Sequence, residues 1–272
     1  MHPTLFTIPV PEFLHGFLPT QISIHSYGFL IALGALLAYL YLSKQLKNRF
    51  GVSTDQSQNL FIFLVVGGFV GGKLFFYFED PSYYFGTPAN MVKKLGGGFV
   101  FYGSLLFDIP IVIWFIRKHK IPALQMLDLV AITVCIVHIF GRLGCFGAGC
   151  CHGLPYDGPF SVIFTDPGCL AKPLNTPLHP TQLYSVLLIG SILTILLVIK
   201  KRQKFDGQLF FFYIMLYAFG RSIIEIFRGD AKRGFIIDGY VSHSQFISLI
   251  LVLVVGFFYW RLYKQSKLGK SS

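Results

Sequence analysis

The chain has 272 residues, of which 54% are hydrophobic and only 13% are charged, and its mean hydropathy is +0.62. Polar side chains are too few to cover the surface of a water-soluble globule of this size. The composition therefore predicts an integral membrane protein. Because the apolar stretches are continuous and do not alternate with polar residues, they indicate membrane-spanning helices and exclude a β-barrel.

Taken in chain order, the apolar stretches predict an all-α protein with seven membrane spans in a single domain, residues 1–272. Each stretch has about the ~20 residues that a helix needs to cross a hydrocarbon core. The predicted spans are 24–42, 60–78, 99–116, 124–144, 183–199, 209–227 and 246–260. The Gly- and Pro-rich segment 145–180 is predicted to be a long extracytoplasmic loop.

Lysine and arginine residues are clustered after the first, third, fifth and seventh spans. These four clusters hold 14 of the 23 basic residues. Because short basic loops stay in the cytoplasm, the clusters predict an N-terminus outside and a cytoplasmic C-terminus. The net charge of +11 is then a topology signal that also attracts anionic membrane lipid. We expect no nucleic-acid partner.

Polar side chains gather at the predicted outer ends of the spans. Such groups are costly within a membrane unless they face the protein interior or a wet cavity, so their depth is informative. The set comprises His25, Tyr27, Lys73, Tyr102, Arg142, His179, Arg221, Glu225, Arg228 and His243. Asp128, near the inner end of the fourth span, is the exception, and we expect it to have a structural role.

Arg221, Glu225 and Arg228 are spaced i, i+4, i+7 and therefore lie along one helix face. Such a stripe can simply tie helices together. Arg142, however, adds another cation at the same predicted depth, and this excess of arginine calls for an anionic partner. Phosphate fits, because the planar guanidinium bonds two phosphate oxygens at once and stays charged when partly desolvated.

The segment GRLGCFGAGCCHG, from Gly141 to Gly153, places Arg142 among glycines that permit tight bends and close approach of a ligand. This pattern resembles the signature of prolipoprotein diacylglyceryl transferases. Five further motifs are similar to that family and occur in the same order: SYGFLIALG from Ser26, GGKLFFYFED from Gly71, GGGFVFYG from Gly96, HPTQLY from His179 and YAFGRSIIEIFRGD from Tyr217. Six ordered motifs make a chance resemblance improbable.

Three residues depart from the family pattern. Tyr102 stands where a histidine is common, Cys145 where an asparagine is often found, and Cys150 in place of a glutamate. The exchange at Tyr102 removes a candidate base.

The resemblance implies an enzyme of the bacterial cytoplasmic (inner) membrane, with its active site on the extracytoplasmic side and no cofactor. It would transfer the diacylglyceryl group of phosphatidylglycerol to the lipobox cysteine of a prolipoprotein, releasing glycerol phosphate. We assign Arg142, Arg221 and Arg228 to a clamp on the departing phosphate. Glu225 would hold Arg221 or Arg228 by an ion pair, or alternatively accept the thiol proton.

The remaining predicted site residues concern proton transfer and head-group binding. His179, Tyr27 and Tyr102 are candidates to accept the thiol proton or to bond the head group, and His179 is favoured by its intrinsic pKa. His179 could instead be a loop residue that caps the next helix, and the tyrosines could be interfacial anchors. The family motifs add three residues to the expected substrate-binding set: Gly153, Tyr217 and Lys73.

The five cysteines do not have the spacing of a metal site. Cys145, Cys150, Cys151 and His152 lack the paired ligands typical of zinc, and adjacent cysteines do not easily bind one ion together. We therefore predict no metal. A disulfide that involves Cys169 is one alternative, and small packing residues are another.

Two other functions are compatible with charged residues in a helix bundle. A lipid or solute transporter would normally show two related halves, and this chain has no evident half-repeat. A non-catalytic lipid-binding relative could keep the arginines and lose turnover through the changes at Tyr102 and Cys150.

Overall fold

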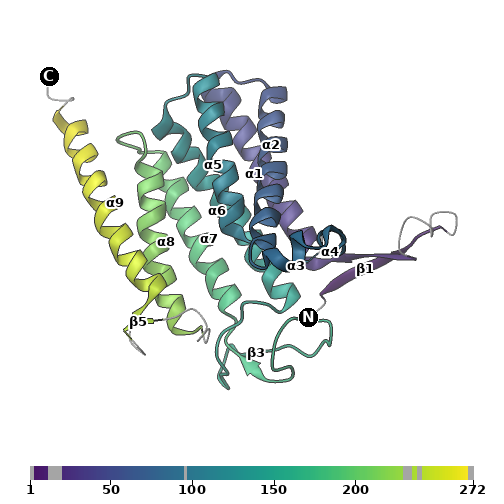
Figure 1. The fold of residues 1–272 in the computed structure, drawn as a ribbon. Coiled ribbons are helices and arrows are strands. Elements are labelled where there is room, and N and C mark those ends of the chain that lie inside the picture. Colours follow the sequence, from purple (N-terminus) through teal and green to yellow (C-terminus); the bar gives the residue numbers. More distant parts are fainter. Residues whose placement is uncertain (1–2, 12–19, 95–96, 229–234, 238–240, 269–272) are drawn as a thin grey trace. The chain divides into compact units, whose positions relative to one another are not determined.

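The computed structural model describes residues 3–11, 20–94, 97–228, 235–237 and 241–268 (Figure 1). The motif residues Gly96, Gly229 and Asp230 lie outside these ranges. The chain divides into two compact units, residues 1–38 with 127–272 and residues 39–126. Each unit is described by itself below.

Helices dominate both units, which confirms the predicted fold class. They are α1 (Ser26–Phe50), α2 (Thr54–Tyr77), α3 (Pro81–Phe85), α4 (Pro88–Lys93), α5 (Phe101–Lys118), α6 (Ala123–Ala148), α7 (Thr181–Lys200), α8 (Gln208–Ile226) and α9 (His243–Leu268). Among the described residues, six are long and apolar enough to cross a membrane: α1, α2, α6, α7, α8 and α9.

The third predicted span, 99–116, corresponds to α5, which is not among these six helices because its charged residues are too many for its short length. It has 18 residues, contains Pro110, and carries Asp108, Arg117 and Lys118. Several helices also extend beyond the predicted spans, because polar and basic residues at their ends continue the helical backbone. In particular, α6 runs to Ala148, so the predicted loop begins four residues later than expected.

The sequence did not predict the short strands. They form three two-stranded antiparallel sheets: β1 (Thr4–Pro9) with β2 (Gln21–His25), β3 (Val162–Ile163) with β4 (Pro177–Leu178), and β5 (Phe235–Ile237) with β6 (Val241–Ser242). Strands β3 to β6 have only two or three residues each, which is too short to show a strand periodicity in sequence.

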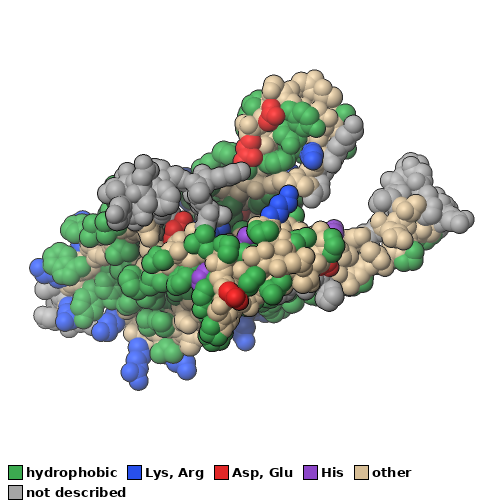
Figure 2. Space-filling view, turned by 90° about the horizontal axis from the view of Figure 1, so that it is seen from below, with side chains coloured by type: hydrophobic (Ala, Val, Ile, Leu, Met, Phe, Trp, Pro, Cys, Tyr) green, Lys and Arg blue, Asp and Glu red, His purple; other side chains and the backbone are tan. Residues whose placement is uncertain are grey.

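Apolar side chains face outward along the membrane helices. Leu187 and Val198 on α7 and Leu253 on α9 are exposed, and hydrophobic side chains cover much of the face seen in Figure 2. Exposed apolar surface of this extent requires a lipid environment.

In the first unit, α7 packs beside α8, and α8 packs beside α9. Helix α6 ends, α7 begins, α8 ends and α9 begins at one end of this unit, where β3 and β5 also lie (Figure 1). That end therefore collects Arg142, His179, Arg221 and Glu225. The basic ends of α7 and α9 lie at the opposite end.

Asp128 holds the start of α8. Its carboxylate accepts hydrogen bonds from the backbone N–H groups of Gly207 (2.7 Å) and Phe210 (3.0 Å), and from the side-chain amide of Gln203. Gly207 is the N-cap residue and has no side chain to cap the helix, so Asp128 supplies the acceptor from α6. This confirms the expected structural role.

Replacing Asp128 with alanine should destabilise the protein. The buried N–H groups of Gly207 and Phe210 would lose their acceptor, at a cost of about 1–3 kcal/mol. Thermal unfolding in detergent should show a lower midpoint for Asp128→Ala than for Asp55→Ala, which removes an exposed carboxylate from the first turn of α2. Equal midpoints for both variants would contradict this role.

In the second unit, small residues let α2 and α5 approach closely. The hydroxyl of Ser104 on α5 donates to the carbonyl of Gly68 on α2 at 2.7 Å. A Cβ atom at Gly103 would overlap the carbonyl oxygen of Gly71, and the reverse also holds. Close backbone packing of this kind is a common way for membrane helices to associate.

Gly103→Ala should therefore separate α2 and α5 and lower the unfolding midpoint, since the overlapping atom is backbone and cannot rotate away. Gly190→Ala on α7 is the control, because a Cβ there meets no atom within 4 Å. The control should be neutral or slightly stabilising, since alanine favours helix over glycine. Similar behaviour of the two variants would refute the close packing.

Candidate active site

Helix α6 presents a polar face near its C-terminal end. His138, Arg142 and Cys145 are spaced i, i+4, i+7 and share that face. The Nε–H of Arg142 donates to Nε2 of His138 at 3.3 Å. The imidazole of His138 also lies 5.3 Å from the ring of Tyr217 on α8. His138 thus links Arg142 to the neighbouring polar helix.

Helix α8 carries the second set of polar side chains. Tyr217, Arg221 and Glu225 follow one another at intervals of about one helical turn. Arg221 and Glu225 form an ion pair with both side chains largely buried, at 15% and 9% exposure. This is one of the two pairings expected for Glu225. A carboxylate in this position orients the guanidinium and offsets part of the cost of burying it.

The three arginines belong to one electrostatic cluster. His138 interacts electrostatically with both Arg142 and Arg221, and Arg221 interacts with Arg228. Cys151 interacts with Arg142 and Arg228. These pairwise interactions link the guanidinium groups of Arg142 on α6, Arg221 on α8 and Arg228, two residues beyond α8. Such a cluster suits an anion with several oxygen atoms, such as phosphate.

The loop after α6 is tied to the start of α7 and the end of α8. The N–H of Gly153 donates to the carbonyl of His179 at 2.8 Å, and the N–H of Leu154 donates to the carbonyl of Phe227 at 3.0 Å. A Cβ on Gly153 would overlap the Phe227 carbonyl oxygen. Gly153 is therefore a residue of close backbone approach, which keeps this loop beside the end of α8.

Two side chains of the HPTQLY motif hold the cysteine-containing part of the loop. The hydroxyl of Thr181 donates to the carbonyl of Cys151 at 2.7 Å, and the amide of Gln182 donates to the carbonyl of Cys150 at 2.6 Å. Thr181 and Gln182 are both buried. The first turn of α7 thus fixes the backbone that follows α6.

His179 lies in an aromatic cluster. Its ring stacks on Tyr156 at 4.0 Å and meets Phe227 edge-on, and its Nδ1 is 3.0 Å from the hydroxyl of Tyr184. Helix α7 has Pro180 as its N-cap residue and no side-chain cap, so His179 does not cap this helix. Its role in proton transfer stays a prediction.

Tyr27 lies near the arginines in the first unit. Its backbone is close to Gly144 of α6, where an added Cβ would lie 3.2 Å from the Tyr27 carbonyl oxygen. The phenol interacts electrostatically with Arg142 and with the three cysteines of the same loop. Tyr27 and Tyr217 are thus both close to residues of the arginine cluster.

Lys73 and Tyr102 belong to the second unit, and their expected part in the site stays a prediction. The buried ammonium of Lys73 donates to the carbonyls of Lys94, Gly97 and Gly98 at 3.0, 2.7 and 2.9 Å. These bonds use all three of its donors and anchor the chain that leads into α5. Tyr102, in the first turn of α5, is 74% exposed.

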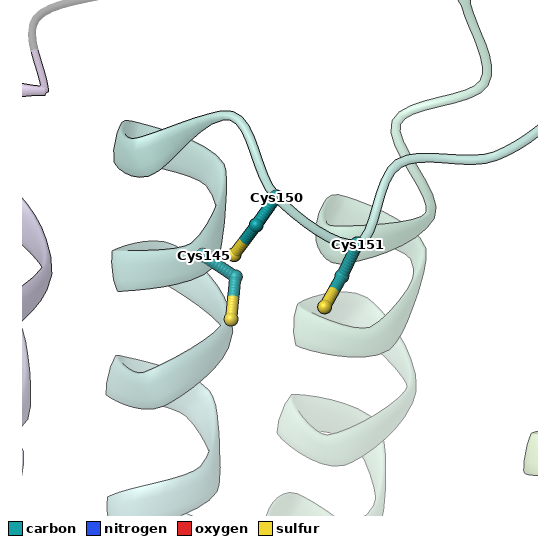
Figure 3. A group of neighbouring side chains, drawn as sticks. All are labelled: Cys145, Cys150 and Cys151. Carbon is teal, nitrogen blue, oxygen red and sulfur yellow. The ribbon is translucent and has the colours of Figure 1, made fainter. Parts of the chain in front are cut away.

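The five cysteines, all within the described residues, are free thiols. The suggested disulfide of Cys169 is therefore absent, and Cys169 packs in the loop core with Phe164 and Leu178. Three others form a group that the sequence spacing argued against: the sulfur atoms of Cys145, Cys150 and Cys151 all lie within 4.8 Å of one another (Figure 3).

Backbone geometry explains how these three sulfur atoms meet. Helix α6 ends in a left-handed residue, Gly149 (φ 76°), and the N–H of Cys150 returns to the carbonyl of Cys145 at 3.0 Å. This turn, known as a Schellman motif, folds Cys150 back onto the last turn of the helix. Cys151 is also left-handed (φ 60°). The side chains of Cys150 and Cys151 therefore do not point to opposite sides, as neighbouring side chains do in an extended chain.

His138 is the site residue that the sequence analysis missed. Its signal was available, since it lies four residues before Arg142 and thus on the same helix face. The cysteine group also had a signal, because a glycine that directly follows a helix commonly adopts the left-handed conformation.

Comparison with known proteins identifies the family. The family described as prolipoprotein diacylglyceryl transferase matches residues 16–261. The chain belongs to this family. Among curated relatives, the phosphatidylglycerol–prolipoprotein diacylglyceryl transferase of Clostridium tetani is 38% identical over 86% of this chain and 91% of its own length.

Two further relatives cover similar shares. The Clostridium perfringens protein named phosphatidylglycerol–prolipoprotein diacylglyceryl transferase 2 is 32% identical over 85% of this chain and 88% of its own length. The enzyme of Dehalococcoides mccartyi is 30% identical over 90% and 92%, respectively. The match to diacylglyceryl transferases therefore includes α6, α8 and the loop between α6 and α7.

Thr181→Val should loosen this loop. The variant keeps the shape of the side chain but removes the donor to Cys151, which lowers the free energy of unfolding by about 1 kcal/mol. Pulsed alkylation with mass spectrometry should show faster modification of Cys150 and Cys151. Thr194→Val is the matched control, because that hydroxyl bonds only to Gly190 of its own helix. Alkylation rates equal to those of the control would show that Thr181 does not hold the loop.

Proposed function

We propose that this protein transfers the diacylglyceryl group of phosphatidylglycerol to the lipobox cysteine thiol of prolipoproteins. The names of the relatives state this reaction for those proteins, and their similarity covers most of the chain. The observation that supports the clamp is the chain of electrostatic interactions that links Arg142, Arg221 and Arg228 through His138 and Cys151.

The reaction exchanges one bond to a glycerol carbon. The substrate sulfur attacks the glycerol carbon that bears the phosphate ester, so that a C–S bond forms while the C–O bond breaks. The electron pair of the C–O bond goes to the phosphate oxygen, and glycerol phosphate leaves. Because negative charge grows on that phosphate, guanidinium groups aimed at it stabilise the transition state more than the ground state.

Two neighbouring side chains orient the clamp. Glu225 pairs with Arg221, and His138 accepts the Nε–H of Arg142. The bond to His138 uses the inner donor of Arg142, so its terminal NH₂ groups remain to form a fork toward phosphate oxygens. We assign Glu225 and His138 as positioning residues.

The thiol proton must leave before or during the attack. A free thiol has a pKa of about 8.5, and neighbouring cations favour the thiolate. We propose that the arginine cluster supplies this effect, with His179, Tyr27 or Tyr102 as proton acceptor. Arg228, Tyr27 and Tyr217 are proposed to contact the head group.

We further propose that the site faces the extracytoplasmic side of the bacterial inner membrane. In the first unit, the basic ends of α7 and α9 lie opposite the end that holds the arginine cluster (Figure 1). Basic segments favour the cytoplasm, so the cluster then belongs on the other side. Prolipoproteins are secreted precursors, which suits a site outside the cytoplasm.

Arg142→Ala and Arg221→Ala should each lower turnover by about 10²- to 10³-fold, the usual effect of removing one donor that stabilises a transition state. Purified protein is mixed with phosphatidylglycerol and a lipobox peptide, and mass spectrometry measures the diacylglyceryl adduct on cysteine. Arg202→Ala, which removes an exposed guanidinium just beyond α7, is the matched control and should retain full activity.

The same assay separates the alternatives. Wild-type protein that binds phosphatidylglycerol but forms no adduct would be a non-catalytic relative, and the proposed transferase would be rejected. Turnover that survives both arginine substitutions would reject the clamp and leave the transferase activity standing.

A further inference from the structure

We propose that Cys145, Cys150 and Cys151 form a three-thiolate site for a thiophilic closed-shell metal ion such as Zn(II). Their sulfur atoms come from the last turn of α6 and the loop that follows, and all lie within 4.8 Å of one another (Figure 3). The inference rests on this geometry, and the site it describes shares the neighbourhood of Arg142 and Arg228 with the proposed phosphate clamp.

The separations are close to those that a bound ion requires. With Zn–S bonds of about 2.3 Å, sulfur atoms around one ion lie roughly 3.8 Å apart in a tetrahedral site and about 4.0 Å apart in a trigonal one. The three sulfurs must therefore move together by at most about 1 Å. Small rotations about the Cα–Cβ bonds supply such a movement without any shift of the backbone.

The backbone that carries the three cysteines is fixed from several sides. Cys150 bonds back to the carbonyl of Cys145, and Gln182 and Thr181 hold the carbonyls of Cys150 and Cys151. The ligands are thus brought together before any ion binds, so little conformational entropy is lost on binding.

Thiols bind a metal ion as thiolates. Binding of an ion to these three cysteines therefore releases their protons to solvent, and the affinity of the site rises with pH.

The neighbouring charges suit the resulting complex. Three thiolates and one divalent ion have a net charge of −1. Arg142 and Arg228 both interact electrostatically with Cys151, and these cations offset that charge. Without them, a partly buried anionic complex would carry a larger desolvation cost.

The ligand set selects the kind of ion. Three soft sulfur ligands favour Zn(II), Cd(II) or Cu(I) over Mg²⁺ and Ca²⁺, which prefer oxygen. In the part of the chain that the structure describes, this group has three members. His152 is not among them, and its Nδ1 lies 3.0 Å from the carbonyl oxygen of Gly153. A fourth coordination position is therefore left for water or another small ligand.

A titration with Cd(II), which reports its thiolate bonds by ultraviolet charge-transfer absorption, tests the site. The full-length protein is kept reduced in detergent. We expect one Cd(II) per chain, and a loss of affinity of tenfold or more in each of Cys145→Ser, Cys150→Ser and Cys151→Ser. Cys135→Ser, which removes a buried thiol elsewhere on α6, is the matched control and should bind like wild type. Binding that is unchanged in the three variants, or absent from wild type, would overturn the proposal.

A second measurement on the wild-type protein does not depend on how the variants fold. Pulsed alkylation and mass spectrometry compare each cysteine with and without Cd(II). The ion should protect Cys145, Cys150 and Cys151 and leave the rate at Cys169 unchanged. Equal rates with and without Cd(II) at the three cysteines, or a disulfide among them in the reduced protein, would refute the metal site.

Discussion

In the first unit, arginine side chains lie near one end of apolar helices, and the cost of placing their charges there must be offset. An isolated arginine in such surroundings is costly, and the cost is tolerable only where hydrogen bonds and opposite charges accompany it. Arg221 has Glu225 one turn away, and Arg142 has His138 one turn away. Each helix thus supplies a local partner for its own arginine, and we propose that the surplus positive charge binds an anion.

The same end of the unit is held together largely by backbone contacts. The loop after α6 bonds to the His179 and Phe227 carbonyls, and Thr181 and Gln182 bond to the carbonyls of Cys151 and Cys150. Gly153 permits this because any larger residue would overlap the Phe227 carbonyl. The loop after α6, the start of α7 and the end of α8 are distant in sequence, and hydrogen bonds between them hold them together. The same contacts determine where the three sulfur atoms lie.

Sequence reasoning predicted the features that depend on composition and helical period. Continuous apolar stretches located the membrane helices, and the spacing of Arg221 and Glu225 predicted their shared face and allowed their ion pair. Sequence reasoning did not predict the positions of the cysteines at the turn after α6. The meeting of Cys145 with Cys150 and Cys151 depends on left-handed backbone at Gly149 and Cys151, and counting residues between cysteines does not reveal such a turn.

Another miss has a different physical cause. His138 was overlooked because a single histidine in an apolar stretch gives no signal of its own, and only its four-residue interval from Arg142 marks it as part of the site. Helix α5 matches the predicted span 99–116, although Asp108, Arg117 and Lys118 give its 18 residues three charges. The family motifs indicated Tyr217, Arg221 and Glu225 on α8, but the contact of Tyr217 with His138 on α6 became clear only from the fold.

The central claim is that the guanidinium groups of separate helices hold one phosphate. An experimental structure of the protein with phosphatidylglycerol in a lipid nanodisc tests it most directly. The account predicts phosphate oxygens within about 2.7–2.9 Å of guanidinium nitrogens from both Arg142 and Arg221. A bound lipid whose phosphate lies away from both arginines, with Arg221 contacting only Glu225 and Arg142 only His138, would contradict it.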